Sequence, residues 1–261
     1  VDIHSLDLYP PAPVCRYLNL PVFCGPRQLK GERDILYRNN GDGTFTDVTD
    51  LAQVKDEKAY YGFTPVFDDL NDDGRPDIFV ANDSSPNYLY LNRGNGRFEE
   101  SALTSGVGFS VDGRAQADMG AALGDYDNDG KIDVFTTTFS EDYFPLFRRN
   151  QSGFFDEISA VSGLGTATFA YLGWGCGFTD LDNDGDKDLF IANGHLFPQL
   201  DRANLGVRYA QTNQLFENLG DGTFDEVSEV SGEGLRVKKV SRGASFGDYD
   251  DDGDIDILVL N

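Results

Sequence analysis

Residues Asp180–Asp188 read DLDNDGDKD, and the apolar run Leu189-Phe-Ile191 follows at once. The same pattern, D-x-[DN]-x-D-G-x-x-D before an apolar run, begins again at Asp69, Asp125 and Asp248. Successive copies start 56, 55 and 68 residues apart. A motif that recurs at such a period indicates a repeat protein, in which each unit buries its faces against its neighbours.

A second motif keeps the same register. In each copy a leucine is followed nine residues later by a phenylalanine, across a Gly-containing turn: Leu36–Phe45, Leu89–Phe98, Leu146–Phe155 and Leu215–Phe224. This spacing predicts a β-hairpin, because glycine supplies the positive-φ positions of tight turns. With a Gly-rich strand before each Asp loop and an apolar strand after it, each unit holds four strands. The sequence therefore predicts an all-β fold, a β-propeller of four-stranded blades.

The repeats divide the chain into two parts. Residues 1–34 form a Pro-rich N-terminal segment, and residues 35–261 hold the propeller repeats. Within the repeats we expect a half-blade at 35–50, blades at about 60–101, 117–159 and 171–228, and a second half-blade at 240–261. The two halves could close into a four-bladed ring, belong to a larger propeller, or pair between molecules, because unpaired sheet edges seek partners. Hydrogen bonds between the strand of Asp256–Leu260 and Leu36–Asn39 of the same chain would show that the ring closes.

The Asp loops have the composition of calcium sites. Positions 1, 3, 5 and 9 offer side-chain oxygens, the glycine at position 6 permits a sharp turn, and position 7 can offer its backbone carbonyl. Oxygen ligands without His or Cys favour Ca²⁺, and crowded carboxylates would repel each other without a cation. We expect about four Ca²⁺ ions, one per loop. The predicted ligands are Asp69, Asn71, Asp73 and Asp77; Asp125, Asp127, Asp129 and Asp133; Asp180, Asp182, Asp184 and Asp188; Asp248, Asp250, Asp252 and Asp256; and the carbonyls of Arg75, Lys131, Asp186 and Asp254.

One blade carries an insertion. The stretch from position 9 of the loop to the hairpin leucine takes 12 and 13 residues in two repeats but 27 between Asp188 and Leu215. The extra residues, roughly Gly194 to Thr212, are expected on one face of the propeller, where insertions often carry binding. A possible ligand surface there comprises His195, Arg202, Arg208 and Tyr209, although a solvated loop explains the last three equally well and a structural hydrogen bond explains His195 better.

The charge of the chain argues against some classes of partner, and its cysteines predict one disulfide. The formal net charge of −24 argues against nucleic-acid partners and anionic membranes, and no stretch approaches the roughly 20 apolar residues of a spanning helix. We expect a disulfide between Cys15 and Cys24 and a buried free thiol at Cys176. His4 falls in a terminal segment expected to be flexible, and no motif of a catalytic elbow or phosphate loop occurs.

The repeats resemble the FG-GAP/VCBS repeats of integrin α-subunit propellers. The chain is more similar to the propeller region of the cartilage acidic protein-like (ASPIC/UnbV-associated) family, through Cys24-Gly-Pro26, Leu36–Phe45, Val80–Ser84, Tyr171–Gly175, Ala192–His195 and Arg242–Asp248. The resemblance implies a secreted, seven-bladed propeller with calcium loops.

We therefore expect an extracellular binding or adhesion module for a protein or glycan rather than an enzyme. The alternatives are a structural subunit that assembles through blade edges and, third, a polysaccharide-active enzyme.

Overall fold

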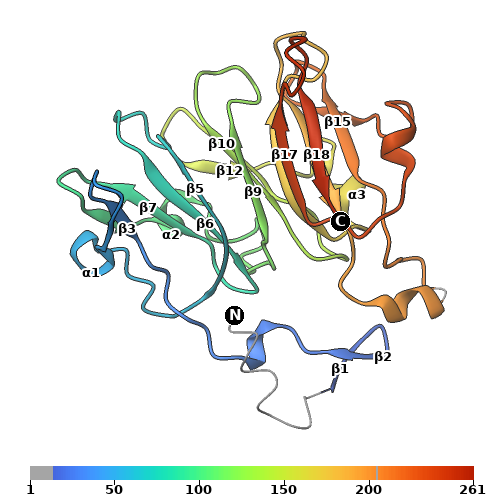
Figure 1. The fold of residues 1–261 in the computed structure, drawn as a ribbon, viewed down its shortest axis with the longest axis horizontal. Helices are drawn as coiled ribbons and strands as arrows, with labels where there is room; N and C mark the ends of the chain where they lie inside the picture. Colours follow the sequence, from blue (N-terminus) through green and yellow to red (C-terminus); the bar gives the residue numbers. More distant parts are fainter. Residues whose placement is uncertain (1–13, 204) are drawn as a thin grey trace.

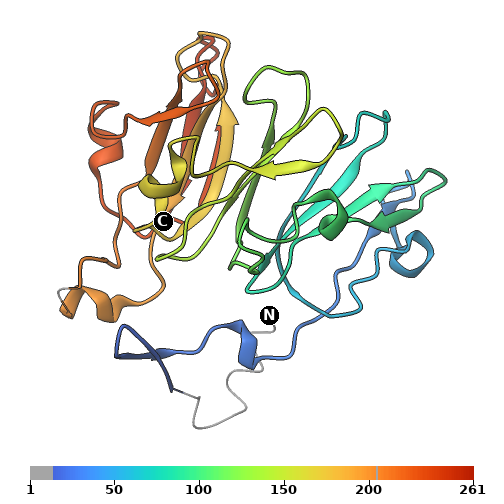
Figure 2. The same ribbon diagram turned by 180° about the vertical axis from the view of Figure 1, so that it is seen from behind.

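The computed structural model describes residues 14–203 and 205–261 and shows β-sheets arranged as a fan (Figures 1 and 2). Each of three consecutive repeats forms one four-stranded antiparallel sheet in chain order. The strands are β5 (Tyr61–Asp68), β6 (Asp77–Asp83), β7 (Tyr88–Asn92) and β8 (Phe98–Glu100); β9 (Gly120–Gly124), β10 (Asp133–Thr137), β11 (Leu146–Arg149) and β12 (Phe155–Glu157); β13 (Gly173–Thr179), β14 (Asp188–Asn193), β15 (Gln214–Asn218) and β16 (Phe224–Glu226).

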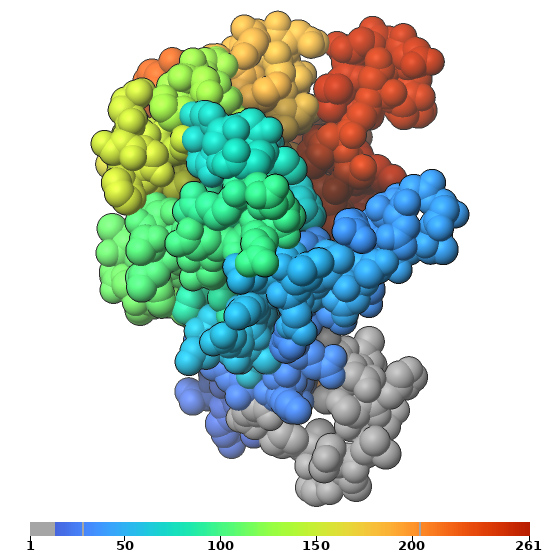
Figure 3. Space-filling view, turned by 90° about the vertical axis from the view of Figure 1, so that its left-hand side faces the viewer, coloured from blue at the N-terminus to red at the C-terminus, as the bar shows by residue number. Residues whose placement is uncertain are grey.

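Two-stranded sheets flank these blades. The N-terminal one pairs β3 (Tyr37–Asn39) with β4 (Phe45–Asp47), and the C-terminal one pairs β17 (Gly243–Gly247) with β18 (Asp256–Leu260). In the complete blades the strand after the Asp loop pairs with the first hairpin strand, for example Phe79 with Leu89. Among the described residues β18 pairs with β17 alone, and β3 with β4 alone. The closed four-bladed ring is therefore not formed, and the tips of the two half-blades stand apart (Figure 3).

The first strands β5, β9, β13 and β17 lie side by side and join neighbouring blades. The Thr64 hydroxyl of β5 donates to the carbonyl of Met119 (2.6 Å), and the Thr137 hydroxyl donates to the carbonyl of Trp174 (2.8 Å). A Cβ on Gly120 would lie 1.8 Å from the Trp174 oxygen, so only glycine permits this approach. The Gly-rich first strands are thus a packing requirement.

Aromatic side chains fill the spaces between blades. Phe135, Phe144 and Phe216 are fully buried with Leu146 and Leu189 between the second and third complete blades. Burial of one such side chain contributes roughly 1.5–3 kcal/mol. A second cluster, around Phe79, Leu89 and Phe147, joins the first and second blades in the same way.

A short helix follows the last strand of each hairpin, which the sequence did not predict. These are α1 (Thr49–Ala52), α2 (Ala102–Ser105), α3 (Leu164–Thr168) and the 3₁₀ helix η4 (Glu233–Arg236). Each has five residues or fewer, too short for a helical period to show in the sequence. Among the described residues no helix is long and apolar enough to cross a membrane.

The N-terminal segment forms a small hairpin of β1 (Val14–Tyr17) and β2 (Leu20–Phe23), followed by the 3₁₀ helix η2 (Pro26–Gln28). The predicted Cys15–Cys24 disulfide is confirmed. Cys176 is free as predicted but only half-buried, packing against the core between the blades. The hairpin lies at the end of the fan opposite the Asp loops (Figure 1), packed on the insertion's 3₁₀ helix η3 (Pro198–Arg202).

Candidate calcium loops and the opposite end of the propeller

The first aspartate of every loop holds the turn closed. In the second loop Asp125 accepts the N–H of Asp129 on Oδ1 (3.0 Å) and that of Gly130 on Oδ2 (2.9 Å). The same two bonds recur at Asp69, Asp180 and Asp248. Gly130 has φ +86°, a left-handed conformation that explains the glycine at position 6. Bonds between the first aspartate and the loop backbone therefore hold the turn in shape.

The ninth-position aspartate ties the loop to its blade. Asp188 accepts the N–H of Leu181 on Oδ2 (2.9 Å) and that of Asn218, on the third strand, on Oδ1 (3.0 Å). Asp77 and Asp133 make equivalent pairs of bonds. A carboxylate that accepts two backbone donors is both a possible ligand and a link between strands.

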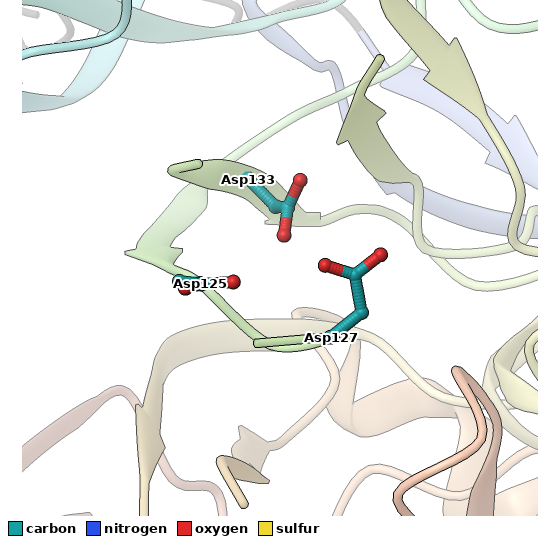
Figure 4. Close-up of side chains that lie close together, drawn as sticks. All are labelled: Asp125, Asp127 and Asp133. Atoms are coloured by element: carbon teal, nitrogen blue, oxygen red, sulfur yellow. The ribbon is translucent and has the colours of Figure 1, made fainter. Parts of the chain in front are cut away.

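Side-chain oxygens converge inside three of the loops. Carboxylate oxygens lie within 4.8 Å of one another in Asp125, Asp127 and Asp133, in Asp180, Asp182 and Asp184, and in Asp248, Asp250 and Asp256. Figure 4 shows the carboxylates of Asp125, Asp127 and Asp133 facing a common space. The Asp127 Oδ1 atom is buried and has no hydrogen-bond partner among the described residues. An orphaned carboxylate oxygen aimed among other carboxylates fits a bound cation.

Burial disfavours the ionised form of the carboxylates in the second loop. Burial, with the charges of Asp127 and Asp129, raises the pKa of Asp133 to about 7, although the backbone N–H groups of Arg149 and Tyr126 donate to this carboxylate and oppose the rise. Burial and the charge of Asp129 likewise raise the pKa of Asp127. A hard divalent cation bound by these oxygens would reverse that cost, because it favours the ionised form.

Neighbouring loops are bonded to one another, which the sequence did not predict. The Asn128 amide, at position 4 of the second loop, donates to Asp186 at position 7 of the third (2.6 Å). Asn183 donates to Asp254 of the fourth loop in the same way (2.8 Å). These bonds join residues 58 and 71 positions apart in sequence, so the second, third and fourth loops form a continuous chain along one end of the fan.

The first loop differs from the others. It has Asn71 at position 3, and the Arg75 side chain at position 7 pairs with Asp73 and donates to the Asn92 carbonyl. In the second loop the Lys131 ammonium pairs with Asp129 at 3.0 Å, whereas the third and fourth loops have aspartate at position 7. The first two loops thus neutralise part of their own charge. The backbone carbonyls of Arg75, Lys131, Asp186 and Asp254 stay predicted ligands.

A cavity of about 510 Å³ lies between the disulfide hairpin and the ends of the blades away from the Asp loops. Aromatic and charged side chains line it together, including Phe23, Arg27, Asp83, Arg114 and Phe139. Phe23 is 53% exposed. This end of the molecule thus offers a concave surface of mixed polarity, the kind of surface that binding sites use.

His195 does not lie on a ligand surface, contrary to that part of the prediction, because its side chain is fully buried. Its Nδ1 accepts the N–H of Phe197 (3.1 Å), so Nε2 carries the proton of the neutral ring and donates it to Ser140 Oγ (3.0 Å). Burial lowers the pKa of His195 to about 4. A neutral ring with this tautomer cannot take a proton from Ser140, so the pair is a structural bond.

Of the other predicted surface residues, Arg202 and Arg208 are exposed and Tyr209 is partly buried. The backbone N–H of Tyr209 donates to Asp201 of η3, and this bond ties the last part of the insertion to that helix. His4 lies outside the described residues.

A profile of FG-GAP-like repeats matches residues 69–136, 125–191 and 203–259. The chain belongs to the FG-GAP-like repeat family. Its repeats are also similar to cartilage acidic protein 1 of Homo sapiens (26% identity over 190 residues), Mus musculus (27% over 194) and Xenopus tropicalis (28% over 191), each over 70% of this chain. These matches cover 25%, 26% and 26% of the relatives, so the chain spans about a quarter of their length.

Among solved structures, a lectin of Agrocybe aegerita described as recognising non-reducing terminal N-acetylglucosamine is similar at 17% identity, with a TM-score of 0.39. The match covers 88% of this chain and 69% of that one, and a likeness of this strength carries no argument about function.

Proposed function

We propose that this chain is a calcium-stabilised, extracellular binding module of the adhesion type rather than an enzyme. The observation that carries the proposal is the Asp127 carboxylate, which has a buried, orphaned oxygen and lies with Asp125 and Asp133 in a group whose oxygens are within 4.8 Å of one another. The Cys15–Cys24 disulfide supports an oxidising compartment, where calcium is plentiful. In this proposal the ions stabilise the loops, and the ligand does not bind at them.

We place the ligand, a protein or a glycan, at the end away from the Asp loops, in the cavity under the disulfide hairpin. Arginine and aromatic side chains there are the residue types that dominate binding energy at interfaces. The Arg27 side chain lines the cavity on η2. The insertion, which carries the exposed Arg202 and Arg208, packs through η3 on the disulfide hairpin.

The test is a binding screen of the calcium-loaded protein against a glycan array and a panel of extracellular-matrix proteins. Any ligand that is found is then measured against Arg27→Glu, with Arg97→Glu in the exposed turn of the β7–β8 hairpin as the matched control. We expect Arg27→Glu alone to weaken binding at least tenfold. Equal binding by both variants would contradict the placement, and turnover of a polysaccharide would contradict the binding-module proposal.

A second candidate function is self-association through blade edges. The β18 edge has no further strand among the described residues, and Leu258 and Leu260 on it are 65% and 62% exposed. An unpaired strand of this kind is a template for another strand. Light scattering with and without EDTA separates the candidates, because a monodisperse monomer in calcium contradicts assembly.

A further inference from the structure

A second group of buried oxygens lies outside the Asp loops, between the N-terminal half-blade and the first complete blade. Asp34 precedes β3, Asp56 follows α1, and Tyr88 and Tyr90 lie on β7. Asp56 and Tyr90 are 1% and 0% exposed. No repeat motif brings these residues together, because they come from three separate segments.

Hydrogen bonds fix one side of the Asp56 carboxylate. The Tyr88 hydroxyl donates to its Oδ1 at 2.7 Å, and the Tyr60 N–H donates to the same oxygen at 3.2 Å. The rings of Tyr60 and Tyr88 stack with centroids 5.2 Å apart, which holds both donors in place. The other carboxylate oxygen, Oδ2, is left without these donors.

Three buried oxygens of this cluster have no hydrogen-bond partner among the described residues: Asp34 Oδ2, Asp56 Oδ2 and Tyr90 Oη. They surround one buried cluster: the Tyr88 hydroxyl bonds Asp56, and the centroid of the Tyr88 ring lies 5.3 Å from that of Tyr90. Asp34 lines the same cavity as Val54, Ile78 and Val80, which pack with both tyrosines. Buried polar atoms in folded proteins almost always have a partner. Three unpartnered oxygens around one buried cluster therefore point to a bound species.

The surroundings are apolar, so burying the two ionised carboxylates of Asp34 and Asp56 costs folding free energy. Tyr88 and Tyr90 belong to a buried cluster with Val54, Ile78 and Val80. Arg33, the adjacent cation in the sequence, pairs with exposed Asp50 at 2.8 Å. Two neighbouring carboxylates in an apolar environment require a compensating positive charge.

We propose that Asp34, Asp56 and Tyr90 bind one hard cation, Ca²⁺ in an extracellular setting, at a site separate from the Asp loops. The carboxylates are the principal ligands, the phenol oxygen is a weaker one, and water completes the six to eight oxygens that Ca²⁺ takes. Asp34 lines two open cavities of about 330 and 650 Å³, which give ion and water a path to the site. The ion would fasten the N-terminal half-blade to β7.

The test is the calcium content of the full chain, measured by native mass spectrometry after equilibration with calcium. We expect the double variant Asp34→Asn/Asp56→Asn to bind one ion fewer than the wild type. The matched control, Asp225→Asn, replaces an exposed carboxylate on β16 and should bind the wild-type number. Equal ion content in the double variant and the wild type would overturn the proposal.

The ion count tests this site separately from calcium binding by the Asp loops. If the loops bind no calcium, Asp127→Asn leaves the ion content unchanged while the double variant still loses one ion. Should the double variant fail to fold, Tyr90→Phe keeps the ring and removes only the orphaned oxygen. With terbium alone as the probe, we expect Tyr90→Phe to lower the affinity of one site severalfold, and unchanged titrations would contradict the proposal.

Discussion

Asp127→Asn should have opposite effects on stability with and without calcium. The variant keeps the shape of the side chain and removes one charge from a group whose oxygens lie within 4.8 Å of those of Asp125 and Asp133. At that separation two charges repel by about 3 kcal/mol at an effective dielectric of about 20, and by about 1 kcal/mol in water. Because Asp127 is only half-buried, we expect the variant to be about 1–2 kcal/mol more stable than the wild type in EDTA.

In calcium the order should reverse. An ion at 100 times its dissociation constant stabilises the folded state by about 2.7 kcal/mol, and most of this is lost when a carboxylate ligand becomes an amide. Urea unfolding at neutral pH, in EDTA and in saturating calcium, measures both values. The exposed carboxylate variant Asp225→Asn should unfold like the wild type under both conditions. A variant destabilised equally in EDTA and in calcium would refute the reasoning.

Three further outcomes follow from other contacts. Burial raises the pKa of Asp118 to about 7 against an unfolded value of about 3.9, so the contribution of Asp118 to folding stability should fall by up to about 4 kcal/mol as pH rises from about 4 to about 7. The difference in stability between the wild type and Asp118→Asn should follow that slope in pH-dependent urea titrations. Burial lowers the pKa of His195 to about 4, so the contribution of His195 has the opposite slope and falls as pH drops from about 6.5 toward 4; the difference between the wild type and His195→Gln should show it in the same titrations. Asn183→Ala breaks the hydrogen bond to Asp254 and should lower the free energy of unfolding by about 0.5–1.5 kcal/mol. Calorimetric calcium titration of this variant should also show weaker coupling between the third and fourth loops. An isotherm identical to that of the wild type would contradict the coupling.

The repeat explains why so much of the fold was predictable. Strands such as Leu189–Ile191 follow each Asp loop at constant spacing, and local chemistry sets both the turn and the strand. The FG-GAP-like family and the four-stranded blades are confirmed. The Cys15–Cys24 disulfide was also predictable, because a nine-residue separation brings the two cysteines close within one hairpin.

What the sequence did not predict depends on contacts between distant segments. The Asn128–Asp186 bond joins two loops, and neither residue belongs to the predicted ligand set as a side chain. Asp34, Asp56 and Tyr90 come to one buried cluster only through the packing of a half-blade on a blade. His195 was placed on a possible surface because it begins an insertion, but the disulfide hairpin covers it, with the Tyr17 ring 5.3 Å from the imidazole.

We propose that divalent ions hold the Asp loops, and through them the blades, in place. Differential scanning calorimetry of the intact chain in saturating calcium and in excess EDTA tests it most directly. We predict a single transition that moves to clearly higher temperature with calcium and returns when EDTA is added. Identical melting curves, with no calcium in the purified protein, would contradict the claim.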